Sequence, residues 1–178
     1  AQPERPGAAV RHHRQHRPVR TRLDLGCGRG AVLIATALRV PHGHATGIDL
    51  WRSRDQSGNS AEATRKNTEL NGVADRITLE TGDMTALPYE DASFDLVTAS
   101  ISIHNIPDAK GRGRAVSEAL RVLRPGGRLV IVDLGRTKEY IEVLRNAGVP
   151  FTATPAGWQM QWGMLPTTII QAQKSTRS

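Results

Sequence analysis

The residues best suited to hold a ligand form one glycine-rich run, Leu23-Asp24-Leu25-Gly26-Cys27-Gly28-Arg29-Gly30. Glycine is needed where a backbone passes within contact distance of a ligand, because any Cβ would collide with it. Free N–H groups at the start of a helix attract a carboxylate or a phosphate. A dinucleotide site needs Gly-x-Gly-x-x-Gly, whereas the third glycine here, Gly30, comes one residue early. Asp24 suits an ammonium better than a pyrophosphate, so the run predicts a site for a methionine-like head group.

An acid at the end of the second predicted strand is suited to hold a sugar. Asp49 comes 19 residues after Gly30, and a carboxylate at this place in a nucleotide-binding fold can accept both hydroxyls of a ribose. Leu50 and Trp51 follow directly, and we expect one of them to lie against an adenine ring. Together with the glycine run, Asp49 therefore indicates a nucleoside ligand.

The end of the third predicted strand carries Gly82, Asp83 and Met84. The Asp83 side chain could accept a hydrogen bond from the adenine amino group, and the Met84 N–H could donate to a ring nitrogen. Ligands of open α/β sheets bind outside the carboxyl ends of the strands. Because all three segments follow predicted strands, they predict one crevice at a single edge of the sheet.

His104 is the candidate general base of the chain. It lies in the segment 100–107, which follows the fourth predicted strand. An imidazole, with an ordinary pKa near 6.5, can accept a proton from a hydroxyl or an amine. A histidine that only packs or braces the loop is the alternative interpretation.

The spacing of apolar residues predicts the elements that position these side chains. From Arg22 onward, short apolar runs alternate with helical patterns, which is typical of a doubly wound α/β fold with a mostly parallel sheet. Predicted strands are 22–25, 45–50, 77–81, 94–99 and 128–134, and predicted helices are 30–40, 60–71, 110–123 and 137–146. We expect five β–α units, with Ser60 as a helix cap and a tight turn over 124–127. Two extended pieces, 151–154 and 167–172, predict a terminal hairpin that adds one antiparallel strand.

Five segments, in this order, resemble class I S-adenosylmethionine-dependent methyltransferases, most closely the small-molecule type that includes quinone-biosynthesis enzymes. They are the glycine-rich run, Asp49, Gly82-Asp83-Met84, Leu87-Pro88-Tyr89 with the following residues to Val97, and Leu123-Arg124-Pro125-Gly126-Gly127-Arg128-Leu129. The resemblance covers roughly residues 22–174, and the combined order is far more specific than any one motif.

The resemblance implies a Rossmann-like seven-stranded sheet in the order 3-2-1-4-5-7-6, with the last strand antiparallel. It implies S-adenosylmethionine as the cofactor and S-adenosylhomocysteine as its product. The segment 100–107, with His104, should then face the sulfonium methyl group, and the acceptor is a small organic molecule methylated on oxygen, nitrogen or carbon. The expected cofactor site consists of Asp24, Gly26, Cys27, Gly28, Gly30, Asp49, Leu50, Trp51, Gly82, Asp83, Met84 and Ser100.

Several other chemistries lack the residues that they need. The Asn/Asp-Pro-Pro-aromatic pattern of adenine or glutamine methylation is absent from 100–107, and Cys27, the single cysteine, lies in the glycine run, where it cannot serve C5-pyrimidine chemistry. Only Asp108 lies near the acceptor side, so we expect no metal. The early third glycine and Asp24 also argue against a nucleotide-dependent oxidoreductase.

The positive charge of the chain is concentrated at its start. Residues 1–22 hold six arginines and one glutamate, so this segment carries +5 of the formal net charge of +7. We expect residues 1–21 to form a disordered basic tail and 22–178 to form the cofactor-binding domain, without the roofing helices that related enzymes place before the first strand. The tail favours, as an alternative, an RNA methyltransferase with an electrostatic handle. A non-catalytic cofactor-binding subunit, which would turn over no acceptor, is a further alternative. Arginines surround His12, His13 and His16, which argues against a metal there.

Composition also sets expectations for location and assembly. No apolar run reaches 18 residues, so we expect no membrane span, and a single cysteine fits a reducing, cytoplasmic setting. An alternating stripe near the C-terminus would face one side of a strand. This stripe consists of Trp158, Met160, Trp162 and Met164. We expect it to pack in the core or between subunits. A wall of the acceptor pocket and a homodimer face are the alternative interpretations.

Overall fold

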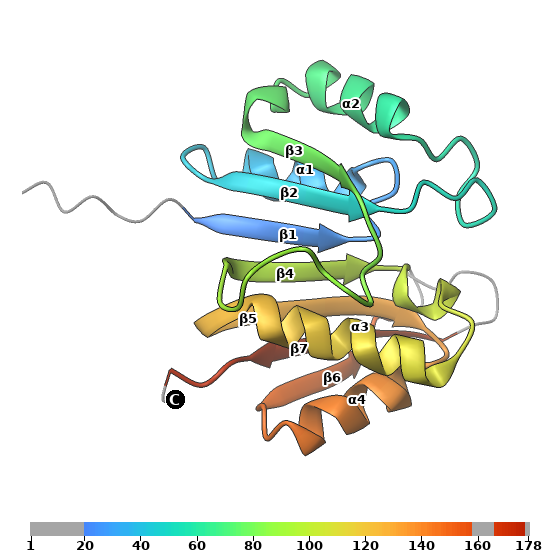
Figure 1. Ribbon diagram of the computed structural model, residues 1–178, viewed down its shortest axis with the longest axis vertical. Coiled ribbons are helices and arrows are strands. Elements are labelled where there is room, and N and C mark those ends of the chain that lie inside the picture. Colours follow the sequence, from blue (N-terminus) through green and yellow to red (C-terminus); the bar gives the residue numbers. More distant parts are fainter. Residues whose placement is uncertain (1–19, 158–165, 177–178) are drawn as a thin grey trace, which may run out of the picture.

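The structure is a computed structural model that describes residues 20–157 and 166–176. Most of the predicted basic tail, and the whole stripe from Trp158 to Met164, lie outside the described residues. Seven strands form one sheet in the order β3-β2-β1-β4-β5-β7-β6 (Figure 1). The predicted strand order is therefore confirmed.

The strands lie close to their predicted positions. Their bounds are β1 Thr21–Leu25, β2 His44–Asp49, β3 Ile77–Thr81, β4 Phe94–Ser100, β5 Leu123–Leu134, β6 Phe151–Pro155 and β7 Thr167–Gln173. The pairs from β3 across to β5 are parallel, and β7 runs antiparallel to both β5 and β6, as expected for the last strand. β1 begins one residue inside the predicted tail, because the Thr21 N–H donates to Asp95 Oδ2 at 2.8 Å.

Helices follow β1, β2, β4 and β5. They are α1 Ala31–Leu38, α2 Ala61–Leu70, α3 Ala109–Val122 and α4 Thr137–Asn146, with short 3-10 turns η1 Ala74–Arg76 and η2 Ile103–Asn105. The predicted cap of α2 is confirmed, since Ser60 Oγ accepts the Ala63 N–H at 3.1 Å. α1 lies behind the sheet and α3 and α4 lie in front of it (Figure 1), which is the doubly wound arrangement.

Two expectations for the connections were wrong. Residues 124–127 form the start of β5 rather than a tight turn, because Gly126 N–H donates to Lys174 O at 2.9 Å and Gly127 O accepts from the Lys174 N–H at 3.0 Å. A register shift between Phe94 and Leu96 absorbs the local bend. The count of five β–α units was also wrong, because no helix stands between β3 and β4 in this fully described part of the chain.

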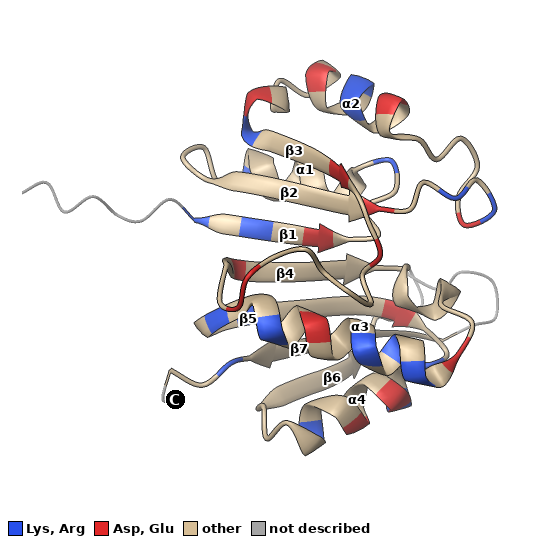
Figure 2. Cartoon of the chain, in the orientation of Figure 1, with Lys and Arg blue, Asp and Glu red and all other residues tan. Residues whose placement is uncertain are grey.

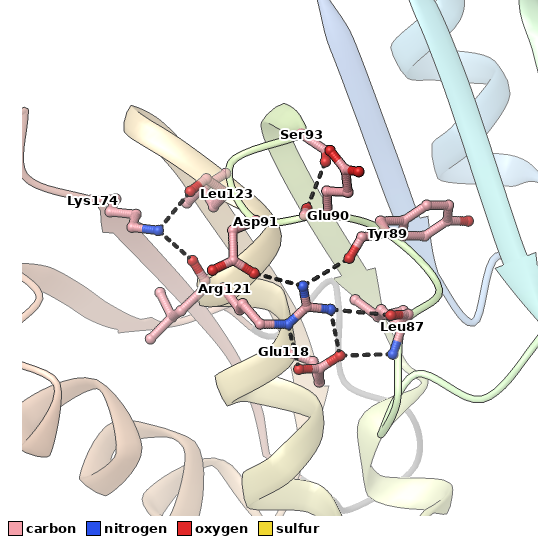
Figure 3. Close-up of polar contacts among 10 residues, drawn as sticks. Leu87, Tyr89, Glu90, Asp91, Ser93, Glu118, Arg121, Leu123 and Lys174 are labelled. Carbon is pink, nitrogen blue, oxygen red and sulfur yellow. Dashed lines mark hydrogen bonds and ion pairs between the residues drawn. The ribbon is translucent and has the colours of Figure 1, made fainter.

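The helix-free connection from β3 to β4 is held by Arg121 of α3 (Figure 3). Its guanidinium donates to Tyr89 O at 2.7 Å and Leu87 O at 3.0 Å, and it pairs with Glu118 and Asp91 at 2.7 and 2.8 Å. Glu118 Oε2 in turn accepts the Leu87 N–H at 2.7 Å. These contacts replace the hydrogen bonds that a helix would supply, and they fix the chain that leaves Gly82-Asp83-Met84.

Two hydrophobic clusters hold the layers together. The larger packs strands β1, β4, β5 and β7 against α3 and α4 and includes the fully buried Tyr140 and Leu144. The smaller packs α1 against β2 and includes Cys27, Leu33 and Val73. Each fully buried side chain of this size contributes roughly 1.5–3 kcal/mol, so the carboxyl ends of the strands rest on a rigid base.

Candidate functional site

The predicted site residues gather at the carboxyl edge of the sheet. Acidic segments lie at or near the arrowheads of β1, β2, β3 and β5, which point to the same side (Figure 2). Asp24 precedes the last residue of β1, Asp49 ends β2, and Ser100 ends β4. The topology therefore brings the separate motifs to one edge, as predicted.

The glycine run needs its glycines for backbone geometry and for space. Gly26, Gly28 and Gly30 have φ angles of +65°, +50° and +87°, values that residues with a side chain rarely adopt. A Cβ on Gly26 would lie 2.5 Å from Ser102 Cβ and 3.0 Å from Met84 Cε. The structure thus places Gly26 between Met84, which sequence predicted for the site, and Ser102, which it did not.

Asp49 joins the second strand to the glycine run. Its Oδ2 accepts the Gly28 N–H at 2.9 Å, and its Oδ1 accepts the Trp51 N–H at 2.6 Å and Asn59 Nδ2 at 3.1 Å. Asn59 is buried, and its Oδ1 has no hydrogen-bond partner within the described residues. An unpartnered buried acceptor is costly, so a donor placed next to this oxygen would stabilise it.

Four polar side chains that sequence reasoning missed hold the outer side of the glycine run. Arg29 N–H donates to Gln56 Oε1 at 3.0 Å, and Arg29 O accepts from Asn67 Nδ2 at 2.9 Å. Thr64 Oγ1 donates to Gly28 O at 2.7 Å, and Asn59 acts through Asp49. Thr64 and Asn67 stand three residues apart on one face of α2, which is the only signal in the sequence that pointed to them.

Asp24 is the most perturbed acid of the site. It is 4% exposed, and its Oδ1 accepts from Thr98 Oγ1 at 2.6 Å. Burial raises the pKa of Asp24 to about 7, the Thr98 hydrogen bond opposes this shift, and the nearby Asp49 charge adds to it. A positive group beside Asp24 would favour the ionised form. Burial also raises the pKa of the Cys27 thiol far above its usual range, so Cys27 is a packing residue beside the ligand loop.

The residues predicted to contact adenine lie at the ends of β2 and β3. Trp51 has a φ of +55°, and its indole N–H donates to Thr81 Oγ1 at 2.9 Å, so its ring reaches from β2 to β3. Leu50 is 39% exposed. The exposed Asp83 accepts the Thr85 N–H through Oδ1 at 2.8 Å. These side chains thus follow the carboxyl ends of two strands that are neighbours in the sheet.

His104 has a buried acidic partner that sequence reasoning missed. Its Nδ1 lies 2.5 Å from Asp133 Oδ1, and its own backbone N–H donates to Asp133 Oδ2 at 3.0 Å. Tyr140 Oη donates to the same Oδ2 at 3.1 Å. Asp133 sits inside the apolar run of β5, 29 residues beyond His104, where the sequence indicated only a core strand.

The described part of the chain contains neither a cluster of metal-binding side chains nor a membrane-spanning helix. Within 20–157 and 166–176, no group of three or more His, Cys, Asp or Glu side chains is arranged to hold a metal ion. None of the helices in these ranges is long and apolar enough to cross a bilayer.

Comparisons with known proteins agree with this geometry. The chain is 38% identical over 114 residues to the ubiquinone/menaquinone biosynthesis C-methyltransferase UbiE of Roseobacter denitrificans, covering 64% of this chain and 42% of that protein. It is 42% identical over 113 residues to a 27-O-demethylrifamycin SV methyltransferase of Amycolatopsis mediterranei, covering 62% and 37%. The chain thus spans less than half the length of these curated relatives.

Among solved structures, the fold matches the geranyl diphosphate C-methyltransferase of Streptomyces coelicolor, in complex with Mg²⁺, geranyl diphosphate and S-adenosylhomocysteine. The TM-score is 0.69 at 16% identity, covering 88% of this chain and 71% of that one. A family described as a methyltransferase domain matches residues 23–131, which is more than half of the chain. The match includes the glycine run, Asp49, Asp83 and His104, and the chain therefore belongs to this methyltransferase domain family.

Proposed function

We propose that this chain binds S-adenosylmethionine and transfers its methyl group to a small organic acceptor through oxygen, nitrogen or carbon. The observation that carries the proposal is the link between Asp49 and Gly28, whose atoms lie 2.9 Å apart. This link sets an acid suited to bind a sugar beside the glycine run, which itself contains Asp24. Relatives of the chain are named as a C-methyltransferase of ubiquinone/menaquinone biosynthesis and a 27-O-demethylrifamycin SV methyltransferase, which supports the activity and the acceptor class.

The residues of the crevice fit this cofactor in charge and in space. Asp24 is the residue that would take the ammonium, since its buried carboxyl gains most from a positive neighbour. The face of Gly26 has no side chain and would take the amino-acid end. Asp49 and the free Oδ1 of Asn59 would take the sugar hydroxyls.

The positions of the remaining site residues indicate where the adenine base and the methyl group would lie. The bound cofactor supplies a methyl group already activated on sulfur, so the protein mainly has to align donor and acceptor. Leu50, Trp51, Asp83 and Met84 would enclose the base of the nucleoside, and Cys27, Gly30 and Gly82 would form the backbone walls. Ser100 and the following segment, with His104, would face the methyl group.

Binding of S-adenosylhomocysteine tests the cofactor. A ligand at about 100 times its dissociation constant stabilises a protein by roughly 2.7 kcal/mol, so we expect a clear rise of the melting temperature and a saturable signal in isothermal titration calorimetry. NAD is the control, because the third glycine is out of place for a dinucleotide. No thermal shift at millimolar S-adenosylhomocysteine, or a larger shift with NAD, would contradict the proposal.

The basic N-terminal segment favours one second candidate, methylation of RNA. The +5 charge of residues 1–22 would contact phosphates. RNA binding that weakens steeply with salt, and that is lost when residues 1–20 are removed, would support it. If S-adenosylhomocysteine binds but neither RNA nor any small acceptor is methylated, the chain is a cofactor-binding subunit. A cytoplasmic location and a homodimer are our further proposals, and light scattering of the full chain tests the second.

A further inference from the structure

We infer that Asp133 positions His104 as a general base and that the acceptor is therefore a hydroxyl compound, such as a phenol, a hydroquinone or an alcohol. This inference rests on the proposed methyl transfer and names the acceptor class of the same site. Three contacts carry it, namely His104 Nδ1 to Asp133 Oδ1 at 2.5 Å, His104 N–H to Asp133 Oδ2 at 3.0 Å, and Tyr140 Oη to Asp133 Oδ2 at 3.1 Å.

The contacts of Asp133 determine which ring nitrogen of His104 carries the proton. Its side chain is 1% exposed. Oδ1 also accepts the Leu134 N–H at 2.8 Å, so each carboxylate oxygen accepts one backbone N–H, which can only donate. Both oxygens therefore act as acceptors toward the surrounding backbone. Nδ1 of His104 must then donate to Oδ1, and in the neutral ring this leaves the lone pair on Nε2.

Ser102 connects the glycine run to the segment that holds His104. Ser102 Cβ occupies the space next to Gly26, and Ser102 Oγ donates to Leu25 O at 2.8 Å. His104 follows two residues later, and the intervening Ile103 is fully buried. The chain enters this segment through Ile101, whose φ of +51° is strained for a β-branched residue. The His104 side chain is 24% exposed, which leaves part of the ring open to an acceptor and to solvent.

The charges of the neighbouring elements do not compete for His104. From α3, Arg112 is paired with Glu139 of α4 at 2.6 Å and holds the carbonyls of Ile106 and Pro107 at 2.7 and 3.0 Å. Asp108 accepts the Gly111 N–H at 2.7 Å.

Asp133 of β5 contacts this segment through the backbone N–H and Nδ1 of His104, and Tyr140 of α4 contacts Asp133. Burial and the Asp133 charge raise the pKa of Tyr140 far above its usual range, so its hydroxyl stays a donor. Asp133 is thus the charged partner of the imidazole.

The proposed step is balanced in atoms, electrons and charge. A lone pair of the acceptor oxygen forms a bond to the methyl carbon, and the carbon–sulfur bond breaks with its electron pair left on sulfur. The hydroxyl proton passes to Nε2 of His104. The positive charge lost by the sulfonium thus appears on an imidazolium beside the Asp133 carboxylate, which stabilises it. The proton then leaves to solvent through the exposed part of the ring. A neutral amine can attack with its own lone pair and lose its proton to water after the transfer. A neutral hydroxyl is a poor nucleophile until a base removes its proton. The pair therefore favours a hydroxyl acceptor.

Nitrogen NMR of the histidine rings tests the positioning without any acceptor. In the full chain saturated with S-adenosylhomocysteine, we expect His104 as the Nδ1–H tautomer with a bare Nε2. Asp133→Asn should shift the population toward the other tautomer, and Tyr140→Phe should leave it on Nδ1. An Nε2–H tautomer in the unchanged protein would overturn the inference, and this outcome needs no variant, so it stands even if Asp133→Asn does not fold.

Methylation of paired probes tests the acceptor class. Radiolabelled S-adenosylmethionine would be offered with 2-naphthol, a hydroquinone and an aliphatic alcohol, each beside its amine counterpart. We expect the unchanged protein to methylate a hydroxyl probe at a rate that rises with pH through the imidazole range. In Asp133→Asn, this rate should fall about 100-fold or more and should no longer rise with pH. Transfer to amines only, or to no probe while S-adenosylhomocysteine still binds, would overturn the inference. Absence of S-adenosylhomocysteine binding would instead refute the proposed function.

Discussion

The Asp49 carboxylate accepts the backbone N–H of Gly28 across 2.9 Å, and this bond ties the end of β2 to the loop that follows β1. The same carboxylate also accepts the Trp51 N–H and the Asn59 side-chain amide. A carboxylate offers about four acceptor positions, so three protein donors leave room for one hydroxyl. Asp49 alone therefore has room for only one of the two ribose hydroxyls that it was expected to accept, and Asn59 is the candidate acceptor for the other.

Replacing Asp49 tests its role in the sugar site. Asp49→Ala removes a charged acceptor, and hydrogen bonds to charged groups contribute roughly 1.5–3 kcal/mol each. We expect the affinity for S-adenosylhomocysteine to fall at least about 100-fold by isothermal titration calorimetry, with circular dichroism unchanged. Asp49→Asn, which keeps one acceptor, should lose less. Wild-type affinity in Asp49→Ala would show that the sugar lies elsewhere.

The unpartnered oxygen of Asn59 predicts a second contact to the ligand. Asn59→Ala should weaken binding of S-adenosylhomocysteine about tenfold, because one buried hydrogen bond is worth roughly 1–2 kcal/mol. Asn67→Ala is the matched control, since the Asn67 side chain donates to the backbone carbonyl of Arg29 and braces the same loop. Equal losses in the two variants would mean that Asn59 acts only by bracing the loop.

Space at Gly26 can be separated from its backbone conformation. Gly26 and Gly72 share a φ of +65°, but a Cβ on Gly26 would lie 2.5 Å from Ser102 Cβ, whereas one on Gly72 would meet nothing within 4 Å. Gly72→Ala should cost about 1 kcal/mol of unfolding free energy for backbone strain. Gly26→Ala should cost about 1–3 kcal/mol more for the clash and abolish cofactor binding. Similar urea midpoints would argue against the tight contact with Ser102.

The raised pKa of Asp24 predicts how stability and binding depend on pH. In the folded chain, this carboxyl takes up its proton at about pH 7, well above its value in an unfolded chain. The folded state thus binds more protons between about pH 4 and 7, so the contribution of Asp24 to the unfolding free energy is present at low pH and is lost as the pH rises through 7. Asp24→Asn should remove this slope in urea titrations.

Cofactor binding should show the opposite trend, because an ammonium favours the ionised form of Asp24. We expect the affinity for S-adenosylhomocysteine to rise from pH 6 to pH 8 and binding at pH 6 to release a proton. Calorimetry in two buffers with different ionisation heats measures that proton. Asp24→Asn should show no such release, and tighter binding at pH 6 would contradict the assignment.

The Arg121 contacts predict that the connection before β4 is held by one side chain (Figure 3). Arg121→Lys cannot reach the Leu87 and Tyr89 carbonyls together with Glu118, so it should lower the unfolding free energy by about 1–3 kcal/mol and speed hydrogen exchange over residues 85–93. Asp91→Asn, at a carboxyl with 78% exposure, should change the unfolding free energy by less than about 0.5 kcal/mol. Equal effects would show that the exposed pair matters as much as the carbonyl contacts.

Local sequence was enough for the elements and for the edge at which the motifs meet. Apolar runs placed six strands within two residues of their observed ends, and the Ser60 cap was correct, because these features depend on neighbours within one turn or one strand. β5 is the exception, since it starts at Leu123 rather than Arg128 through bonds between Gly126, Gly127 and the distant Lys174.

The sequence by itself therefore determined the fold class and the edge of the sheet where the candidate site residues at the ends of β1, β2 and β3 meet. Only the tertiary structure decided that Asp133 lies against His104, that Asn59 joins Asp49, and that Gln56, Thr64 and Asn67 brace the glycine run. The reason is physical. These contacts join residues 10 to 38 positions apart, and the packing of helices and strands against each other sets them, which no local periodicity records.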